Sequence, residues 1–345
     1  MAQMNRITHI DSLRGLAVLL MVMVHAAATW NPFQGTQSSL LAYSISGLGG
    51  LAAPLFVTLF GWGVYRSEIN IKQRVFYCLV LLLSQIMVNV SSPHIFNTFT
   101  PGVLSLMAIL TLVMPIISGI VGEYDEKKLL IVIILTFSLQ LSFPHIQGTG
   151  QWVERVSDDG ITTILANLLL TGTYPLFPWF IFAFVGAMIS STYYADEPTP
   201  QLTKLGLIGI TLGMMFCLLS FIISQYNDDL WAHPSSEAYL TFFPANPPFI
   251  VAGITGVMLL WFAVKRLKFV MLSSAGRISL TIYIIHFIPL SLMHDFQSLY
   301  GWSLELTAFI VVVYTIMWIP ISALWIYYFP KANLESLIKR LRRLL

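Results

Sequence analysis

Three ionisable residues of the first apolar segment have the types and spacing to hold an anion and move a proton. In the stretch DSLRGLAVLLMVMVH, Asp11 and Arg14 precede a long apolar run and His25 ends it. In an α-helix, the step from Arg14 to His25 turns through about 1100 degrees, so both side chains lie on one face about 16 Å apart. Asp11 lies three residues before Arg14 and shares this face. Charged residues of membrane segments usually face protein or water, so these three are candidates for a site.

Each residue type suggests a separate role in such a site. The planar guanidinium of Arg14 can donate paired hydrogen bonds to a phosphate group. A desolvated imidazole favours its neutral form, so His25 could act as a general base. The structural alternatives stay open at this point. An Asp-x-x-Arg pair can cap a helix and anchor it at the membrane surface, and a lone histidine can hydrogen-bond a neighbouring helix.

A second polar face lies near the end of the chain. In AGRISLTIYIIHFIPL, Ser279, Tyr283 and His286 are four and three residues apart and therefore share one helix face. Arg277 stands just before this helix. Two buried histidines on two polar faces suggest a polar chamber reached from the cytoplasm, with a hydrogen-bonded packing seam as the alternative.

Composition identifies the elements that must position these residues. The chain has 345 residues, of which 57% are hydrophobic and only 10% are charged, and its mean hydropathy is +0.77. These values are typical of an integral membrane protein. The net charge of +2 gives no sign of nucleic-acid binding.

Apolar runs of helical length predict an all-α polytopic bundle of about ten transmembrane helices. The expected spans are 13–30, 47–65, 75–91, 102–121, 129–144, 175–192, 204–224, 247–264, 277–293 and 306–328. With a cytoplasmic N-terminus, every lysine and arginine except Arg155 falls on the cytoplasmic side. The positive-inside rule therefore predicts a multi-pass cell-membrane protein with both termini in the cytoplasm.

Two further segments differ from plain spans. Residues 1–330 form the expected transmembrane domain, and residues 331–345 form a basic amphipathic cytoplasmic tail. The stripe of apolar side chains in NLESLIKRLRRLL predicts a helix on the lipid of the inner leaflet. The stretch ITTILANLLLTG is about 18 Å long as a helix, too short to cross, and is expected to be interfacial or re-entrant.

Five short stretches, taken in their order along residues 6–290, resemble motifs of transmembrane acyltransferases. DSLRGLAVLLMVMVH is similar to the first-helix signature of the acyltransferase-3 family, in which ten residues separate an arginine from a histidine. APLFVTLFGWGV and GRISLTIYIIH resemble two further helices of that superfamily. TPGVLSLMAIL and TYPLFPWFIFAFVGAMI resemble the bacterial and archaeal relatives of heparan-alpha-glucosaminide N-acetyltransferase.

The resemblance implies transfer of an acetyl group from cytoplasmic acetyl-CoA to a hydroxyl or amine of an extracytoplasmic sugar or glycan. Arg14, Arg277, Ser279 and Tyr283 would then bind acetyl-CoA, and no metal is expected. Our hypothesis is that His25 deprotonates the acceptor, that Asp11 holds Arg14, and that His286, Ser279 or Tyr283 donates to the developing oxyanion. An acetyl-histidine intermediate is the competing route.

The chain departs from the glucosaminide family in two places. The animal enzyme has an asparagine near the position of His25 and a candidate catalytic histidine in its first outer loop. Here that loop, NPFQGTQSSLLAYSISG, contains no histidine, so the role of His25 rests on the acyltransferase-3 pattern. Ser105 and Leu106 replace the Gln-Arg or Gln-Leu that follows PGVL in that family. Both differences weaken the case for glucosamine as the acceptor.

Aromatic residues open the sixth predicted span. In YPLFPW, Tyr174 and Trp179 are expected to line the entrance for a carbohydrate acceptor, because flat rings pack against sugar rings. The alternative is an interfacial aromatic belt with a proline in the first helical turn.

The main alternative function is a proton-coupled secondary transporter of a small polar solute. Ten helices interrupted by glycine and proline suit broken-helix binding sites. No acidic residue falls in the middle of a predicted span to couple an ion, although a pair of His25 and His286 could do so. A non-catalytic scaffold protein is the third alternative, and a homodimer is one open arrangement.

Overall fold

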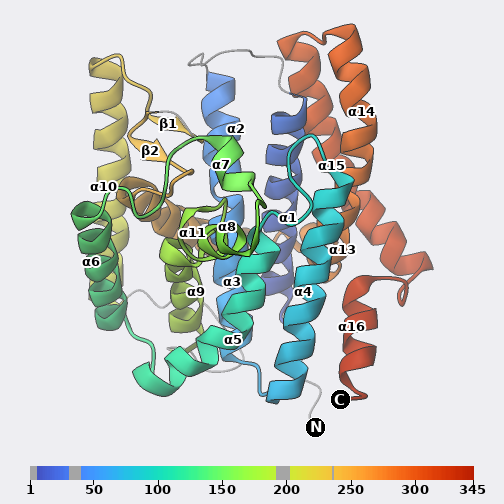
Figure 1. The fold of residues 1–345 in the computed structure, drawn as a ribbon, viewed down its shortest axis with the longest axis horizontal. Coiled ribbons are helices and arrows are strands. Elements are labelled where there is room, and N and C mark those ends of the chain that lie inside the picture. Colours follow the sequence, from blue (N-terminus) through green and yellow to red (C-terminus); the bar gives the residue numbers. More distant parts are fainter. Residues whose placement is uncertain (1–5, 31–39, 192–202, 235–236) are drawn as a thin grey trace.

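The structure is a computed structural model that describes residues 6–30, 40–191, 203–234 and 237–345. Regular structure in these ranges is almost entirely helical, and most helices run roughly side by side (Figure 1). The predicted all-α architecture is therefore confirmed. Most of the first outer loop of the sequence analysis, residues 31–39, lies outside the described residues.

The first half of the chain contains nine α-helices and one π-helical segment: α1 (Thr8–Thr29), α2 (Leu40–Gly50), α3 (Ala52–Tyr65), α4 (Ile71–Ser91), α5 (Val103–Val121), α6 (Glu126–Ser142), α7 (Trp152–Val156), α8 (Ile161–Ala166), η1 (Asn167–Thr171) and α9 (Leu176–Ser191). The second half contains the remaining elements: α10 (Lys204–Tyr226), β1 (Ala232–His233), β2 (Leu240–Thr241), α11 (Pro247–Leu267), the 3₁₀ turn η2 (Val270–Leu272), α12 (Ser273–Arg277), α13 (Ser279–Ile285), α14 (Phe287–Tyr300), α15 (Leu304–Tyr328) and α16 (Leu334–Arg342). The two strands form a short parallel pair.

Each of the ten predicted spans coincides with helix. Among the described residues, eight helical segments are long and apolar enough to cross a membrane, and a ninth crossing results if Ile161–Thr171 and Leu176–Ser191 form one bent span. The remaining predicted span, 129–144, corresponds to α6. This helix has 17 residues and is about 26 Å long, which is at the lower limit for a span. The chain is a multi-pass membrane protein, and eight helical segments among its described residues, or nine with the bent pair, have the length and composition of a span.

The stretch ITTILANLLLTG forms α8 and η1, and its axis is bent by 48° from that of α9. This geometry is that of a broken span or a re-entrant loop, the second of which the sequence analysis expected. Asn167 fastens this stretch to the segment that precedes it, because its side-chain amide donates to the carbonyls of Glu154 and Ser157.

Helix α1 lies within the bundle and is held close to α12 by glycines. A Cβ atom at Gly15 would overlap the carbonyl of Leu272, and one at Gly276 would overlap the carbonyl of Asp11. Only a helix pair without side chains at these two positions can approach so closely. Because Arg14 and Arg277 are the neighbours of these glycines, the crossing brings the two predicted polar segments together.

A buried amide network organises the start of α5. The Gln85 side chain of α4 accepts a hydrogen bond from Leu104 N at 3.1 Å and donates to Asn89 at 2.8 Å. Asn89 in turn donates to the carbonyls of Thr98 and Thr100. These bonds satisfy backbone groups at the first turn of α5, so the TPGVL motif has a structural role here.

Candidate active site

The charged residues at the start of α1 form a connected cluster. Asp11 is buried, with 4% of its surface exposed, and accepts a hydrogen bond from Arg6 Nε at 2.6 Å. The Arg14 guanidinium lies 3.7 Å from the other carboxylate oxygen. The expected contact between Asp11 and Arg14 is therefore present, and Arg6 is a third member that the sequence analysis missed. A carboxylate shared by two arginines fixes the position of Arg14.

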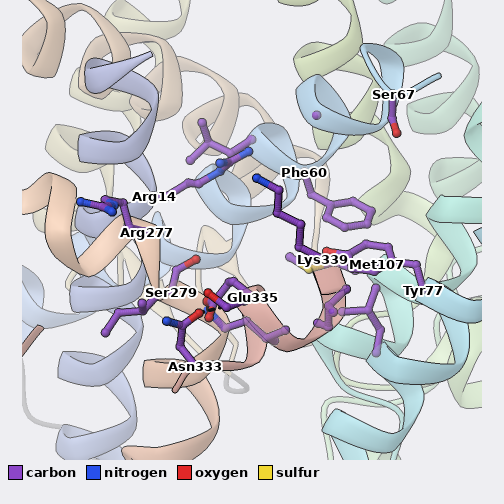
Figure 2. A pocket seen from close by; sticks show the side chains of 18 of the residues that line it. Arg14, Phe60, Ser67, Tyr77, Met107, Arg277, Ser279, Asn333, Glu335 and Lys339 are labelled. Atoms are coloured by element: carbon purple, nitrogen blue, oxygen red, sulfur yellow. Dashed lines mark hydrogen bonds between the residues drawn. The ribbon is translucent and has the colours of Figure 1, made fainter. Parts of the chain in front are cut away.

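Arg14 borders a cavity of about 510 Å³ at this end of the bundle. The cavity lies between α1, α3, α4, α5, the α12–α13 region and the C-terminal helix α16 (Figure 2). Its size is within the range of pockets that hold small molecules and cofactors. Figure 2 shows that side chains from opposite ends of the chain, Arg14 and Lys339, extend into the same space.

The walls of this cavity divide into a cationic part and an apolar part. Six of its lining residues carry a positive charge and one, Glu335, is a carboxylate: the cations are Arg6, Arg14, Arg74, Arg277, Lys339 and Arg342. The apolar part is formed mainly by Phe56, Leu59, Phe60, Leu81, Leu104 and Met107. Such a cavity suits a molecule with a polyanionic head and a less polar arm.

The two histidines that the sequence analysis singled out contact each other. His25 Nδ1 and His286 Nε2 are 2.9 Å apart, and the imidazole rings are stacked with centroids 5.2 Å apart and planes 9° apart. His286 is fully buried, with 0% of its surface exposed, whereas His25 is half-buried. Two residues separated by 261 positions in the sequence thus form one imidazole pair.

The hydrogen bonds around this pair determine which nitrogen carries each proton. His286 Nδ1 lies 3.0 Å from the carbonyl of Ile282. Because a carbonyl can only accept, His286 must donate from Nδ1, and its neutral ring then accepts at Nε2. His25 must therefore donate from Nδ1, which leaves an unprotonated Nε2 on His25. The arrangement presents one imidazole nitrogen as a proton acceptor, oriented by a second histidine and a backbone carbonyl.

Aromatic residues connect the cavity to the histidine pair. Phe56 lines the cavity and packs on Tyr283 with ring centroids 6.3 Å apart. Tyr283 packs in turn on His25 at 6.1 Å and on His286 at 5.8 Å. The apolar wall of the cavity is therefore one aromatic residue away from the imidazoles.

The predicted donor-binding residues fall at different depths. Ser279 at the start of α13 lines the cavity, and Arg277 lies at its exposed rim. Tyr283 is buried beside the histidines, with 3% of its surface exposed, and is not among the residues that line the cavity. The stripe of Ser279, Tyr283 and His286 thus runs from the cavity to the imidazole pair, as its spacing predicts.

Trp179, which the sequence analysis expected at an acceptor entrance, lies in the core of the structure. Its side chain is completely buried, with 0% exposed, and packs against Phe182, Phe242 and Phe249. Tyr174 is half-buried and contacts Trp179 edge-on at 5.1 Å. Since α9 packs tightly on α3 in the interior of the bundle, aromatic residues at its start belong to the core. Neither residue lines the cavity that Arg14 borders.

A second histidine pair lies near the opposite end of α1. His94 and His294 are stacked with centroids 4.4 Å apart, and His294 Nδ1 lies 3.4 Å from the carbonyl of Thr29. Burial, and secondarily the neighbouring His294, lower the pKa of His94 below its ordinary value. These two histidines are far apart in the sequence, and only the fold pairs them.

In the described ranges, no group of three or more histidine, cysteine, aspartate or glutamate residues is arranged to hold a metal ion. The two cysteines, Cys78 and Cys217, are not joined in a disulfide.

Comparison with known proteins identifies the family to which these features belong. No curated protein matches the chain in sequence. The family model described as an acyltransferase domain, that of the acyltransferase-3 family, matches residues 7–324. The match contains both histidines, the Asp11–Arg14 pair and the polar face of α13. Because it covers nearly the whole sequence, the chain belongs to the acyltransferase-3 family of membrane acyltransferases.

Proposed function

We propose that this membrane acyltransferase takes an acetyl group from acetyl-CoA bound in the cationic cavity and transfers it to a hydroxyl or amine of a carbohydrate at His25. The phosphates of the donor would contact Arg14 and the other cations, and its thioester arm would extend along the apolar wall toward Tyr283. Acetyl-CoA has the required form, with several phosphate charges at one end and the reactive carbonyl at the other.

One observation carries this proposal. Helix α1 is unbroken from Thr8 to Thr29, so Arg14 in the cavity and His25 on His286 are held about 16 Å apart on one face. A rigid helix thereby fixes the distance between an anion-binding group and a proton acceptor. A long, flexible donor with phosphates at one end matches this separation.

In the proposed reaction, the acceptor oxygen or nitrogen attacks the thioester carbonyl carbon while its proton passes to His25 Nε2. The new C–O or C–N bond forms, the C–S bond breaks, and the leaving thiolate takes the proton from His25. His286 positions His25 throughout by accepting the hydrogen bond from Nδ1. Tyr283 lies close enough to the pair to be the donor to the developing oxyanion.

The distribution of basic residues supports a proposed orientation in the membrane. We propose that the cavity opens to the cytoplasm, where acetyl-CoA is available, and that the acceptor arrives from the other face of the cell membrane. A sugar or glycan acceptor is supported by the resemblance of TYPLFPWFIFAFVGAMI to relatives of heparan-alpha-glucosaminide N-acetyltransferase. Ser105 and Leu106, which differ from the pattern of those relatives, leave the particular sugar to experiment.

Donor binding is tested by calorimetric titration of acetyl-CoA into the protein purified in detergent. We expect saturable binding that Arg14→Ala weakens about tenfold or more, because a charge-assisted hydrogen bond contributes about 1.5–3 kcal/mol. Arg66→Ala is the matched control, since Arg66 lies over the ring of Trp62 and does not line the cavity. Absence of binding to the folded wild-type protein would overturn the proposal and favour the transporter.

Catalysis is tested by release of the CoA thiol from acetyl-CoA in the presence of a panel of mono- and oligosaccharides. His25→Ala should abolish transfer while acetyl-CoA still binds with wild-type affinity. His94→Ala is the control, because it alters a histidine of the other stacked pair. Full transfer activity in His25→Ala would exclude His25 as the base and as an acetylated intermediate.

A further inference from the structure

The C-terminal helix α16 is fastened to the transmembrane bundle by its own side chains. Glu335 accepts hydrogen bonds from Leu280 N at 2.7 Å and from Thr281 N at 3.2 Å, both in the first turn of α13. The Thr281 hydroxyl donates to the second carboxylate oxygen at 2.6 Å and accepts from Leu334 N at 2.9 Å. Ile338 is buried, with 8% of its surface exposed. The tail is therefore docked against the protein at this end.

The other end of α16 is fastened to a different helix. Gln73 in the first turn of α4 donates to the carbonyl of Arg342 at 3.2 Å. The same glutamine accepts a hydrogen bond from Asn70 N and completes the N-terminal cap of α4. Since α13 and α4 form separate walls of the cavity, α16 connects one wall to the other across the cavity (Figure 2).

Docking divides the basic residues of the tail into two sets. Lys339 and Arg342 are three residues apart, share one helix face and line the cavity. Arg340 and Arg343 are exposed and do not line it. If α16 were held only by attraction to anionic lipid, all four charges would contribute to binding in the same way. In the docked helix, two of the charges border the cavity and two do not.

The cations of the cavity outnumber the carboxylates that could neutralise them. Within the described residues, Arg74, Lys339 and Arg342 form no ion pair with a carboxylate. Arg74 donates to the carbonyls of Ser67 and Thr111. Glu335 uses both carboxylate oxygens on α13. Converging cations without counter-charges repel one another, and a bound polyanion relieves that repulsion.

We infer that α16 is part of the donor site and that Lys339 and Arg342 bind phosphate groups of the donor. This inference rests on the proposed function and adds α16 to the donor site, although this helix lies outside the residues matched to the family. A phosphomonoester carries a charge of about −1.5 to −2 at pH 7, so several phosphates together match the cluster of Arg14, Arg74, Lys339 and Arg342. A soluble polyphosphate with an attached arm is favoured over a lipid headgroup because the apolar wall of the same cavity leads inward, through Phe56, to Tyr283 and the histidines.

The test compares two double variants that remove equal charge from the same helix. The inner variant is Lys339→Ala with Arg342→Ala, and the outer variant is Arg340→Ala with Arg343→Ala. Both are titrated with acetyl-CoA and with adenosine 3′,5′-bisphosphate, which has phosphates but no acyl arm. We expect the inner variant to weaken binding of both ligands about tenfold or more and the outer variant to change it less than about threefold. Thermal unfolding in detergent verifies that both variants are folded.

The outcomes separate this inference from the proposed function. If both variants are folded and change the affinity for the two ligands equally, the inference about α16 is overturned, whereas the proposal that the cavity binds the donor still stands. Binding of the bisphosphate but not of acetyl-CoA, still sensitive to the inner variant, would support the phosphate site and reject the acetyl donor. Binding of neither ligand would overturn both. Binding of both variants to anionic vesicles is measured as well. If only the inner variant loses vesicle binding while its acetyl-CoA binding is unchanged, Lys339 and Arg342 bind a lipid headgroup and the inference is overturned.

Discussion

Replacing His286 tests whether the imidazole pair acts as a unit. His286→Leu keeps a side chain of similar bulk but removes the acceptor that lies 2.9 Å from His25 Nδ1. The backbone carbonyl of residue 286 still accepts the hydrogen bond of Tyr314. The variant should therefore fold, while the His25 ring loses the bond that fixes its tautomer and orientation.

The magnitude follows from what the lost bond does. A buried N–H without a partner costs about 1–3 kcal/mol, which corresponds to about a 5- to 150-fold loss. A histidine in the wrong tautomer can lose up to about 10⁴-fold in activity. We expect kcat of His286→Leu to fall about 10- to 1000-fold. The KM for acetyl-CoA should stay within about threefold, because Arg14 in the cavity is about 16 Å from His25 along α1.

His286→Gln is the conservative partner, since a glutamine amide oxygen can reach the position of the missing Nε2 and accept from His25. It should recover activity to within about tenfold of wild type. Both variants are compared by thiol release at saturating acceptor and by thermal unfolding in detergent. If the leucine variant keeps more than half of the wild-type kcat, or if both folded variants lose activity equally, His286 does not position His25.

Three further predictions concern the surroundings of the site. Arg155 donates to four backbone carbonyls of the segment between α6 and α9, and burial lowers its pKa to about 10, so it remains charged at neutral pH. Arg155→Ala should lower the free energy of unfolding by at least about 3 kcal/mol, and Arg155→Lys should restore only part of it, which detergent unfolding curves can measure. Because the pKa of His94 is lowered in the folded state, the unfolded chain binds its proton more readily. The free energy of unfolding should therefore decrease as pH falls below about 6.5. Melting temperatures recorded between pH 5 and pH 8 should depend less on pH in His94→Asn than in the wild type. An unchanged pH dependence would contradict the role given to His94. Gly15→Ala forces a Cβ atom into the carbonyl of Leu272 and should abolish expression of folded protein, whereas Gly47→Ala, which meets nothing within 4 Å, should be tolerated.

Features that depend on one helix could be predicted from the sequence. Asp11, Arg14 and His25 lie on an unbroken helix, so a fixed rise and rotation per residue convert their spacing into a shared face. The same rule applies to Ser279, Tyr283 and His286, although the helix is interrupted at His286. Apolar runs likewise predicted where helices lie, because the bilayer sets their length.

Features that depend on contacts between distant segments could not be predicted in this way. The amphipathic pattern of α16 led to the prediction of a helix on the inner-leaflet lipid, but the pattern alone does not distinguish lipid from protein as the surface that covers the apolar face. The docking contact depends on Glu335 meeting α13, which only the fold determines. The burial of Trp179 depends on α9 packing against α3, and an aromatic residue at a helix start has the same sequence signal in a belt as in a core.

Burial assigns different roles to the two histidines. His286 has no exposed surface and uses both ring nitrogens, one toward Ile282 and one toward His25. His25 is half-buried, and its Nε2 is free of this hydrogen-bond chain. In the proposed mechanism the acceptor hydroxyl therefore meets His25 rather than His286, and the two residues have different roles. The carbonyl of Ile282 fixes the direction of the chain, so the proton acceptor is set by the backbone of α13 rather than by the order of the histidines in the sequence.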